Sequence, residues 1–212
     1  SRPPTVTLEG YERAFSAHPV TAADLTRTME LLTRSSVHTA MDSLRSGFVT
    51  TPEGHRAGVC GAAALGEHGL VLRRVTSLAI RIARDFPGAA QPVYDALRRA
   101  GSAAGTLIVS PPGLGKTTLL RDLVRLLSDG GTRVALIDER GELSGAGFDV
   151  GRHTDVLTGV PKALAIPMLL RSMSPQLLAA DEITAAGDVD AMEQAVGCGV
   201  GLIATVHGTT LE

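Results

Sequence analysis

The feature that most constrains the fold of this chain is a glycine-rich segment, Ser110–Thr118, which reads Ser-Pro-Pro-Gly-Leu-Gly-Lys-Thr-Thr. An apolar run, Thr106–Val109, precedes it directly, and a helical pattern begins at Lys116 and continues to Leu127. This segment matches the Walker A pattern G-x-x-x-x-G-K-[ST], except that Ser110 replaces the first glycine. A strand that leads through a tight loop into a helix is typical of a parallel sheet in an α/β fold.

The loop has the residue types that bind a nucleoside triphosphate. Gly113 and Gly115 let the backbone wrap closely, so that successive N–H groups can point at phosphate oxygens. Lys116 is expected to reach the β- and γ-phosphates, and the Thr117 hydroxyl to ligate Mg²⁺. The alternative is a Gly/Pro turn that contains a lysine by chance, but it does not account for the flanking strand and helix. We therefore predict that Mg²⁺ and ATP bind here, with the nucleotide on Ser110, Pro111, Pro112, Gly113, Leu114, Gly115, Lys116, Thr117 and Thr118.

The rest of the C-terminal half alternates between strands and helices. Further apolar runs predict strands at Arg133–Ile137, Leu177–Ala180 and Leu202–Val206. The segments between them predict helices at Ala163–Arg171 and Asp188–Val196. Strands that read as continuous apolar runs and alternate with helices form parallel sheets covered on both faces. The predicted fold class is therefore α/β, with a RecA-like P-loop core.

A smaller α+β domain is predicted before this core. A helix start at Thr21–Asp24 opens apolar positions at helical spacing that continue to Gly47. Strand, turn and strand signals follow over residues 48–59, Val71–Ile82 extends that sheet, and Pro92–Arg99 fits a short helix. The predicted division is an N-terminal α+β domain, a Gly/Ala linker and the RecA-like core, at residues 1–100, 101–105 and 106–212. The chain stops soon after its last predicted strand, which is typical of a fragment, so truncation is an expectation for both domains.

Two predicted strands end in adjacent acids, Asp138-Glu139 and Asp181-Glu182. The carboxyl ends of parallel strands share the sheet edge where ligands bind, so these acids are expected near the phosphate loop. We assign Asp181 to the metal and Glu182 to activation of the attacking water. The alternative role for these acids, and for Asp138 above all, is to cap the N-terminus of the next helix.

His207 directly follows the last predicted strand, which places it at the same edge of the sheet. We expect it to sense the γ-phosphate, and we count it with Lys116 and Glu182 among the catalytic candidates. The alternative is a structural histidine whose hydrogen bonds are satisfied within the fold.

Composition excludes several other functions. The formal net charge is −2 and aromatic residues make up 3% with no Trp, so the chain has little with which to bind nucleic acid. Cys60 and Cys198 are too few for a disulfide framework or a zinc site. No apolar run approaches the roughly 18 residues of a membrane-spanning helix, so we expect a soluble protein. The only lysines are Lys116 and Lys162, which rules out an Asn/Thr-Lys-x-Asp motif for reading guanine.

The motifs together resemble a known family. In addition to the phosphate loop, Leu170–Pro175, Asp181–Ile183 and Gly197–His207 are similar to the secretion-type ATPases of type II and type IV machineries. A closer set of segments resembles the stage III sporulation protein AA family: Gly54–Arg56, Ile80–Arg84, Leu107–Asp122, Thr154–Leu157, Pro161–Ala163 and Arg171–Pro175. This resemblance covers most of residues 45–212.

The resemblance implies a cytoplasmic ATPase in the mother cell of an endospore-forming bacterium, working at a channel or secretion-like complex that faces the forespore. It also implies a homo-oligomeric ring, expected to be a hexamer, with membrane-embedded partner proteins. The net charge and the few aromatic residues predict no direct contact with nucleic acid. An acidic box at residues 137–142 adds Glu139 and Glu142 to the catalytic candidates. Two positions depart from the pattern. Thr184 follows the Glu-Ile pair where secretion ATPases usually have Arg, and His153 stands where the sporulation proteins tend to have Arg.

In secretion ATPases, arginines of the N-terminal domain reach the nucleotide. The matching candidates are Arg81 and Arg84, together with Arg56. The alternation of Arg81 with Ile80 and Ile82 also fits an ordinary solvated strand face.

Two other functions remain open from the sequence. One is a DNA-translocating RecA-type ATPase, which the net charge and the few aromatic residues disfavour. The other is a nucleotide switch that binds but does not hydrolyse, and that serves as a scaffold in the channel complex. Turnover assays with and without DNA separate these functions.

Overall fold

The computed structural model describes residues 2–8, 10–33, 47–51, 55–66, 69–101, 105–145 and 147–208. The chain forms two compact units, the first over Ser1–Thr51 and His55–Ile82 and the second from Ala83 to Glu212. The first unit contains a three-stranded sheet and a separate two-stranded hairpin, and the second unit contains a five-stranded sheet.

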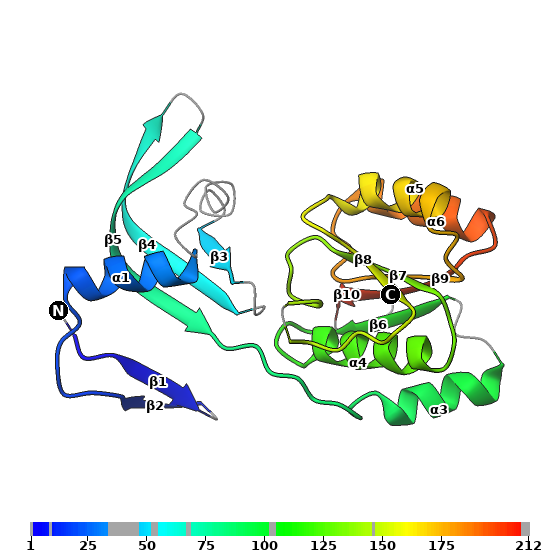
Figure 1. The fold of residues 1–212 in the computed structure, drawn as a ribbon, viewed down its shortest axis with the longest axis horizontal. Helices are drawn as coiled ribbons and strands as arrows, with labels where there is room; N and C mark the ends of the chain where they lie inside the picture. Colours follow the sequence, from blue (N-terminus) through cyan, green and yellow to red (C-terminus); the bar gives the residue numbers. More distant parts are fainter. Residues whose placement is uncertain are drawn as a thin grey trace. The chain divides into compact units, whose positions relative to one another are not determined.

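The second unit is built on a five-stranded sheet in the order β6-β10-β9-β7-β8. Every neighbouring pair in it is parallel. The strands are β6 (Thr106–Ser110), β7 (Val134–Asp138), β8 (Thr154–Thr158), β9 (Leu177–Ala180) and β10 (Gly201–His207). The strand that leads into the phosphate loop therefore lies directly beside β10, and β9 lies on the other side of β10 (Figure 1).

Helices cover both faces of this sheet (Figure 1). The helices are α3 (Gln91–Ala100), α4 (Lys116–Asp129), α5 (Lys162–Ser172) and α6 (Ala186–Gly197). Alternate residues of each central strand enter opposite cores: Leu136 packs with Leu123 of α4, and Ile137 packs with Ile166 of α5. Because both faces are buried, β7 and β9 are buried along their whole length, which explains their continuous apolar sequences. The predicted α/β class with a RecA-like P-loop core is confirmed.

β8 is the one strand of this sheet that the sequence pattern did not predict. Its residues, Thr-Asp-Val-Leu-Thr, are mostly polar and mostly exposed, and it pairs only with β7 among the described strands. An edge strand needs no continuous apolar run, because one side of it faces solvent.

Helix α3 belongs to the second unit. Its Val93, Tyr94 and Leu97 pack against the hydrophobic core that α4 shares with the sheet. The backbone N–H of Ala90, just before α3, donates to the Asp122 carboxylate of α4 at 2.7 Å. The two units therefore divide near residue 82, earlier in the chain than the linker predicted at residues 101–105. Of that segment, residues 102–104 lie outside the described residues.

The first unit contains the predicted smaller α+β arrangement. The antiparallel sheet β3-β4-β5 joins Phe48–Thr50, Arg56–Gly66 and Gly69–Arg81. Helix α1 (Ala22–Leu32) begins with a capping box between Thr21 and Asp24. The continuation of this helix predicted over residues 34–46 lies outside the described residues. A hairpin of β1 (Thr5–Leu8) and β2 (Tyr11–Ala14), which was not predicted, precedes it. Among the described residues, no helix is both long and apolar enough to span a membrane.

Candidate active site

The phosphate loop leaves the end of β6 and becomes the first turn of α4. Ser110 is the last residue of the strand, residues 111–115 form the turn, and Lys116, Thr117 and Thr118 open the helix. Gly113 and Gly115 have φ values of 81° and 85°, a left-handed conformation in which a side chain would be strained. The helix N-terminus directs its free N–H groups toward this turn, as an anion-binding loop requires.

Lys116 is folded back onto its own loop. Its Nζ donates to the carbonyl oxygens of Ser110 at 2.7 Å and Pro111 at 2.9 Å. The third contact of Nζ, at 2.9 Å, is with Nδ1 of His207. The strand register explains this contact, since His207 is the direct partner of Ser110 in the β10–β6 pair. The residue is only 7% exposed, so this ammonium group is held in a fixed place beside the loop.

Asp181 lies beside the first turn of α4. Its Oδ2 accepts a 2.7 Å hydrogen bond from the Thr117 hydroxyl, and its Oδ1 accepts one from the Thr205 hydroxyl. A hydroxyl and a carboxylate that lie side by side are hard oxygen ligands of the kind that Mg²⁺ takes together with phosphate and water. The described residues contain no cluster of three or more His, Cys, Asp or Glu side chains that could hold a metal alone. The Thr117 hydroxyl and the Asp181 carboxylate are two oxygens that fit a magnesium ion whose remaining ligands come from phosphate and water.

Glu182 is held in place through both its backbone and its carboxylate. Its φ of 53° is left-handed, which is uncommon for a residue with a side chain and occurs where surrounding contacts enforce it. Its N–H donates to the Thr205 hydroxyl at 2.8 Å. Its Oε1 lies 2.8 Å from Nε2 of His207, and its Oε2 pairs with the Arg140 guanidinium. Thr205 thus bridges the two neighbouring acids.

These contacts determine the tautomer of His207. The Lys116 ammonium group can only donate, so Nδ1 of His207 accepts and Nε2 carries the hydrogen that is donated to Glu182. Lys116, His207, Glu182 and Arg140 form one continuous chain of polar contacts along the carboxyl edge of the sheet.

The acidic box is a rigid loop after β7. Asp138 is buried and accepts hydrogen bonds from the N–H groups of Glu142, Leu143 and Ser144, at 2.8–3.0 Å, and from the Ser144 hydroxyl. Asp138 therefore caps its own loop, whereas the alternative considered from the sequence was a cap at the N-terminus of a helix. Glu139 pairs with the buried Nζ of Lys162 at 2.6 Å.

A pocket opens between this loop and the end of β9. Its lining is almost entirely charged: Asp138, Glu139, Arg140, Glu142, Lys162, Asp181 and Glu182. The structure thus brings together all four acids that the sequence analysis nominated as catalytic or metal-binding residues.

Arg121 of α4 fastens the acidic-box loop from the other side. Its guanidinium donates to the carbonyl oxygens of Leu143 at 2.9 Å and Glu142 at 2.6 Å, and lies 3.7 Å above the Phe148 ring. It also donates to the Arg84 carbonyl at 3.1 Å. Burial lowers the pKa of Arg121, and the nearby charges of Asp85 and Asp138 partly offset that effect.

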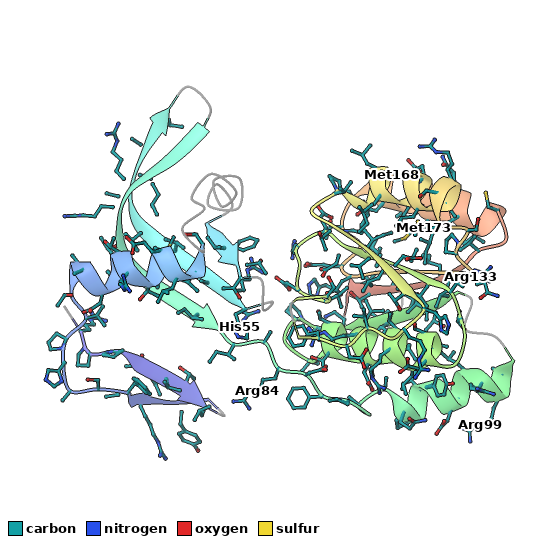
Figure 2. All side chains as sticks on the ribbon, viewed as in Figure 1. His55, Arg84, Arg99, Arg133, Met168 and Met173 are labelled. Atoms are coloured by element: carbon teal, nitrogen blue, oxygen red, sulfur yellow. The ribbon has the colours of Figure 1, made fainter. Side chains whose placement is uncertain are left out.

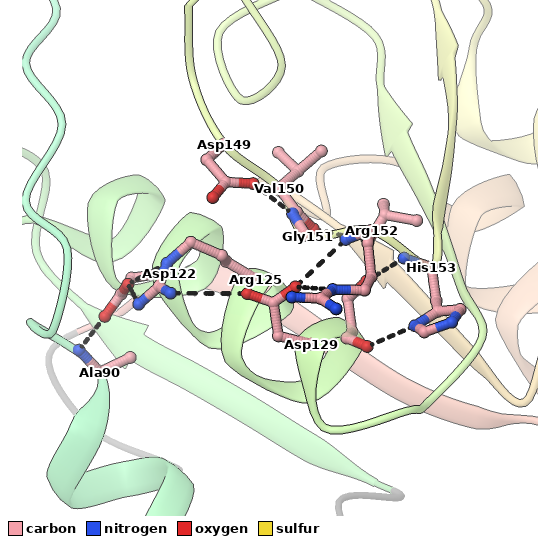
Figure 3. A network of polar contacts seen from close by, with 11 residues as sticks. Ala90, Asp122, Arg125, Asp129, Asp149, Val150, Gly151, Arg152 and His153 are labelled. Carbon is pink, nitrogen blue, oxygen red and sulfur yellow. Dashed lines mark hydrogen bonds and ion pairs between the residues drawn. The ribbon is translucent and has the colours of Figure 1, made fainter.

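A second network occupies the far half of α4 (Figure 3). Arg125 pairs with Asp122 at 2.6 Å and with Asp129 at 3.7 Å. His153 is the residue that departs from the sporulation pattern. Its backbone N–H donates to the Ser128 hydroxyl at 2.8 Å, and its ring Nδ1 lies 2.9 Å from the Ser128 carbonyl oxygen. This histidine fixes the segment before β8 onto α4, far along the helix from the phosphate loop.

The N-terminal arginines are placed differently from one another. Arg81 ends β5 of the first unit, directly opposite Arg56 in the β4–β5 register. Arg84 lies in the segment that leads to α3, with an exposed side chain (Figure 2). Arg56 stacks on Phe48, with its guanidinium carbon 3.7 Å from the ring centre.

Three residues that contact the predicted catalytic groups were missed by the sequence analysis: Arg140, Lys162 and Thr205. Thr205 gave a signal, since it is a polar residue inside an otherwise apolar strand two positions before His207. Arg140 lies inside the acidic box and Lys162 inside the family-like segment Pro161–Ala163, but nothing in the sequence indicated which acids they would contact.

Comparisons with known proteins agree with this architecture. The chain is 38% identical over 210 residues to stage III sporulation protein AA of Bacillus subtilis (strain 168), which covers 93% of this chain and 68% of that protein. It is 30% identical over 150 residues to Protein SEEDLING PLASTID DEVELOPMENT 1 of Arabidopsis thaliana, over 66% of this chain and 21% of that protein.

Two solved structures share the fold. The Legionella pneumophila ATPase DotB superposes with a TM-score of 0.65 at 19% identity, over 99% of this chain and 60% of that one. The pilus retraction motor PilT, with bound ADP, superposes with a TM-score of 0.62 at 14% identity, over 98% and 61% of the two chains. The model of the family described as sporulation stage III, protein AA, matches residues 4–212, and the chain belongs to that family.

Proposed function

We propose that this chain binds ATP with Mg²⁺ and hydrolyses it, to energise a channel or secretion-like complex between mother cell and forespore. One observation carries the proposal. Lys116 is joined through His207 to Glu182, so the lysine proposed to bind phosphate and the acid proposed to activate water lie at one edge of the sheet. The similarity of the fold to an ATPase and to a pilus retraction motor supports it.

In this proposal the loop N–H groups and Lys116 bind the β- and γ-phosphates. Thr117 and Asp181 hold Mg²⁺, which neutralises phosphate charge when bound. The hydrogen bond between these two residues is 2.7 Å long, and this closeness of the two oxygens supports their joint role at one ion. Thr205 keeps Asp181 in this orientation from the opposite side.

Glu182 is the proposed base that orients and deprotonates the attacking water. Two other acids, Glu139 and Glu142, share its pocket. The carboxylate of Glu139 is paired with the buried Lys162 at 2.6 Å. The backbone of Glu142 is held by Asp138 and Arg121, which suits it to shaping the pocket. Glu182 contacts His207, and through it Lys116, which connects this acid to the phosphate loop.

His207 is the proposed sensor of the γ-phosphate. Of the three groups that Lys116 contacts, two are carbonyls of the loop itself and the third is His207. When Lys116 turns toward a phosphate, it gives up its contact with Nδ1 of His207. Because Nε2 of His207 contacts Glu182, this change reaches the proposed base.

The assembly and location belong to the same proposal. We propose a homo-oligomeric ring, expected to be a hexamer, in the mother-cell cytoplasm, docked on membrane-embedded partners and without direct contact to nucleic acid. The chain spans 68% of the length of the Bacillus subtilis relative.

The direct test measures phosphate release from Mg-ATP, together with nucleotide binding and mass in solution. Wild type should release phosphate, and Lys116→Ala should abolish release and weaken binding. Binding without release in wild type would identify a nucleotide switch instead of an ATPase. Release that rises strongly on addition of DNA would favour a DNA-translocating ATPase.

A further inference from the structure

The Arg140 side chain occupies a position that the proposed chemistry above does not use. Its guanidinium pairs with Oε2 of Glu182, while His207 engages Oε1 of the same carboxylate. The two donors come from different strands, since Arg140 follows the end of β7 and His207 ends β10. Glu182 itself follows β9, which lies between those strands in the sheet. Its carboxylate is therefore held from both neighbouring strands.

The loop that carries Arg140 is fastened on several sides. Asp138 accepts hydrogen bonds from its backbone, Arg121 binds two of its carbonyl oxygens, and Lys162 pairs with the adjacent Glu139. Because these contacts hold the loop in place, the backbone that carries the Arg140 side chain is fixed. The backbone of an arginine in a loop without such contacts is not. A rigid support of this kind is what places a catalytic carboxylate within the tolerance that chemistry requires.

The pair is poorly suited to a purely structural role. The side chains of Arg140 and Glu182 are 45% and 25% exposed, and ion pairs in such positions typically contribute about 0–1 kcal/mol to stability. The backbone of Glu182, by contrast, is in an uncommon left-handed conformation. Such strain persists where a site needs a side chain aimed in one direction.

We propose that Arg140 is a positioning residue for ATP hydrolysis, which holds the Glu182 carboxylate at the angle needed to orient the attacking water. This inference rests on the proposed function, because it concerns the same reaction. Arg140 touches Glu182 and acts through it. A lysine in its place supplies the charge without the planar fork, so it restores the role only in part.

The test compares the turnover kinetics of Arg140→Ala, Arg140→Lys and Glu182→Gln, with Arg171→Ala as the matched control. Arg171 is an exposed arginine in the last turn of α5, away from the pocket. Arg140→Ala should lower kcat about 10- to 100-fold, with little change in KM for ATP or in melting temperature. Arg140→Lys should lie between wild type and Arg140→Ala, and Arg171→Ala should match wild type. Added guanidinium ion at millimolar concentration should restore part of the turnover of Arg140→Ala.

The double variant Arg140→Ala/Glu182→Gln separates the two proposals. If Arg140 acts through Glu182, this variant should be no slower than Glu182→Gln alone, because coupled residues are not additive. Unchanged or faster turnover in Arg140→Ala, beside a dead Glu182→Gln, would overturn the role of Arg140 and leave the ATPase proposal standing. Normal turnover in Glu182→Gln would instead remove Glu182 as the base.

Discussion

The contacts of Asp122 in α4 predict how much stability the fold loses when this residue is replaced. The residue is 2% exposed and accepts the Ala90 N–H at 2.7 Å and the Arg125 guanidinium at 2.6 Å. Asp122→Ala would leave the buried Ala90 N–H without its acceptor and would remove the nearer of the two carboxylates that pair with the mostly buried Arg125 guanidinium. Removing one partner of a buried ion pair costs about 3–5 kcal/mol, and the partial exposure of Arg125 puts the expected loss near the lower end, about 3 kcal/mol.

The effect has a defined pH dependence. Burial alone would raise the pKa of Asp122, but the N–H groups of Ala90 and Gly88 and the Arg125 guanidinium together hold that pKa below its ordinary value. A carboxyl with a lowered pKa in the folded state stabilises the fold above its unfolded pKa of about 3.9, and this contribution is lost as the pH falls through the folded pKa. The stability difference between wild type and Asp122→Asn should therefore shrink on acidification below about pH 4.

Urea denaturation followed by circular dichroism at pH 7 and at steps down to pH 3 measures both effects. Asp155→Ala is the matched control, because Asp155 is an exposed carboxylate on β8 and such changes usually stay within about 0.5 kcal/mol. A loss below about 1 kcal/mol for Asp122→Ala at pH 7 would refute the buried-pair argument. A difference between wild type and Asp122→Asn that stays constant with pH would refute the linkage.

Three further predictions test the site. Asp181→Asn should raise the Mg²⁺ concentration needed for half-maximal phosphate release, since a neutral ligand holds a hard cation less well; an unchanged Mg²⁺ titration would remove Asp181 from the metal. Glu182→Gln should trap bound ATP without turnover, measured as stable retention of radiolabelled ATP, whereas the same trap in Glu139→Gln alone would move the base to the acidic box. Arg84→Ala or Arg81→Ala should lower turnover at least about tenfold with unchanged ATP affinity and melting temperature, because a supplied arginine stabilises charge in the transition state. If both variants turn over normally, these arginines take no part in the chemistry.

The central part of the fold was predictable because its strands are buried on both faces. β7 and β9 read as continuous apolar runs, and the Gly-Lys-Thr loop marks where β6 gives way to α4. Apolar runs did not predict β8, because this edge strand is mostly polar and contains no continuous apolar run. The pattern also located α3 closely, but a helical period cannot say which core a helix joins. The contact of Val93 and Leu97 with the core beneath α4 decides that, and it is a tertiary contact.

The sequence predicted the site residues that directly follow apolar runs. It did not predict the residues whose positions depend on strand register or on the path of a loop. Residues directly after apolar strands, such as Asp181 and His207, come together because parallel strands share one carboxyl edge. Which groups touch depends on register and on loop paths. Ala204 is the partner of Ala180, so the next residue, Thr205, comes beside Asp181, and nothing in the sequence gives that register. Arg140 reaches Glu182 because its loop turns back around Asp138, a path built from backbone hydrogen bonds.

Helix α4 connects the two polar networks of the second unit. Its first turn carries Lys116 and Thr117 of the phosphate loop, and one turn later Arg121 binds both the acidic-box loop and the backbone at Arg84. Asp122, the next residue, holds Ala90. Residues 84–90 are the stretch of chain that follows β5 of the first unit, so that stretch is tied to the helix that holds the phosphate loop. A rigid helix transmits a displacement along its length, because a packed core resists local deformation. If phosphate binds as proposed and shifts the α4 N-terminus, Arg121 and Asp122 are the adjacent side chains that would carry this shift to the acidic-box loop and to residues 84–90.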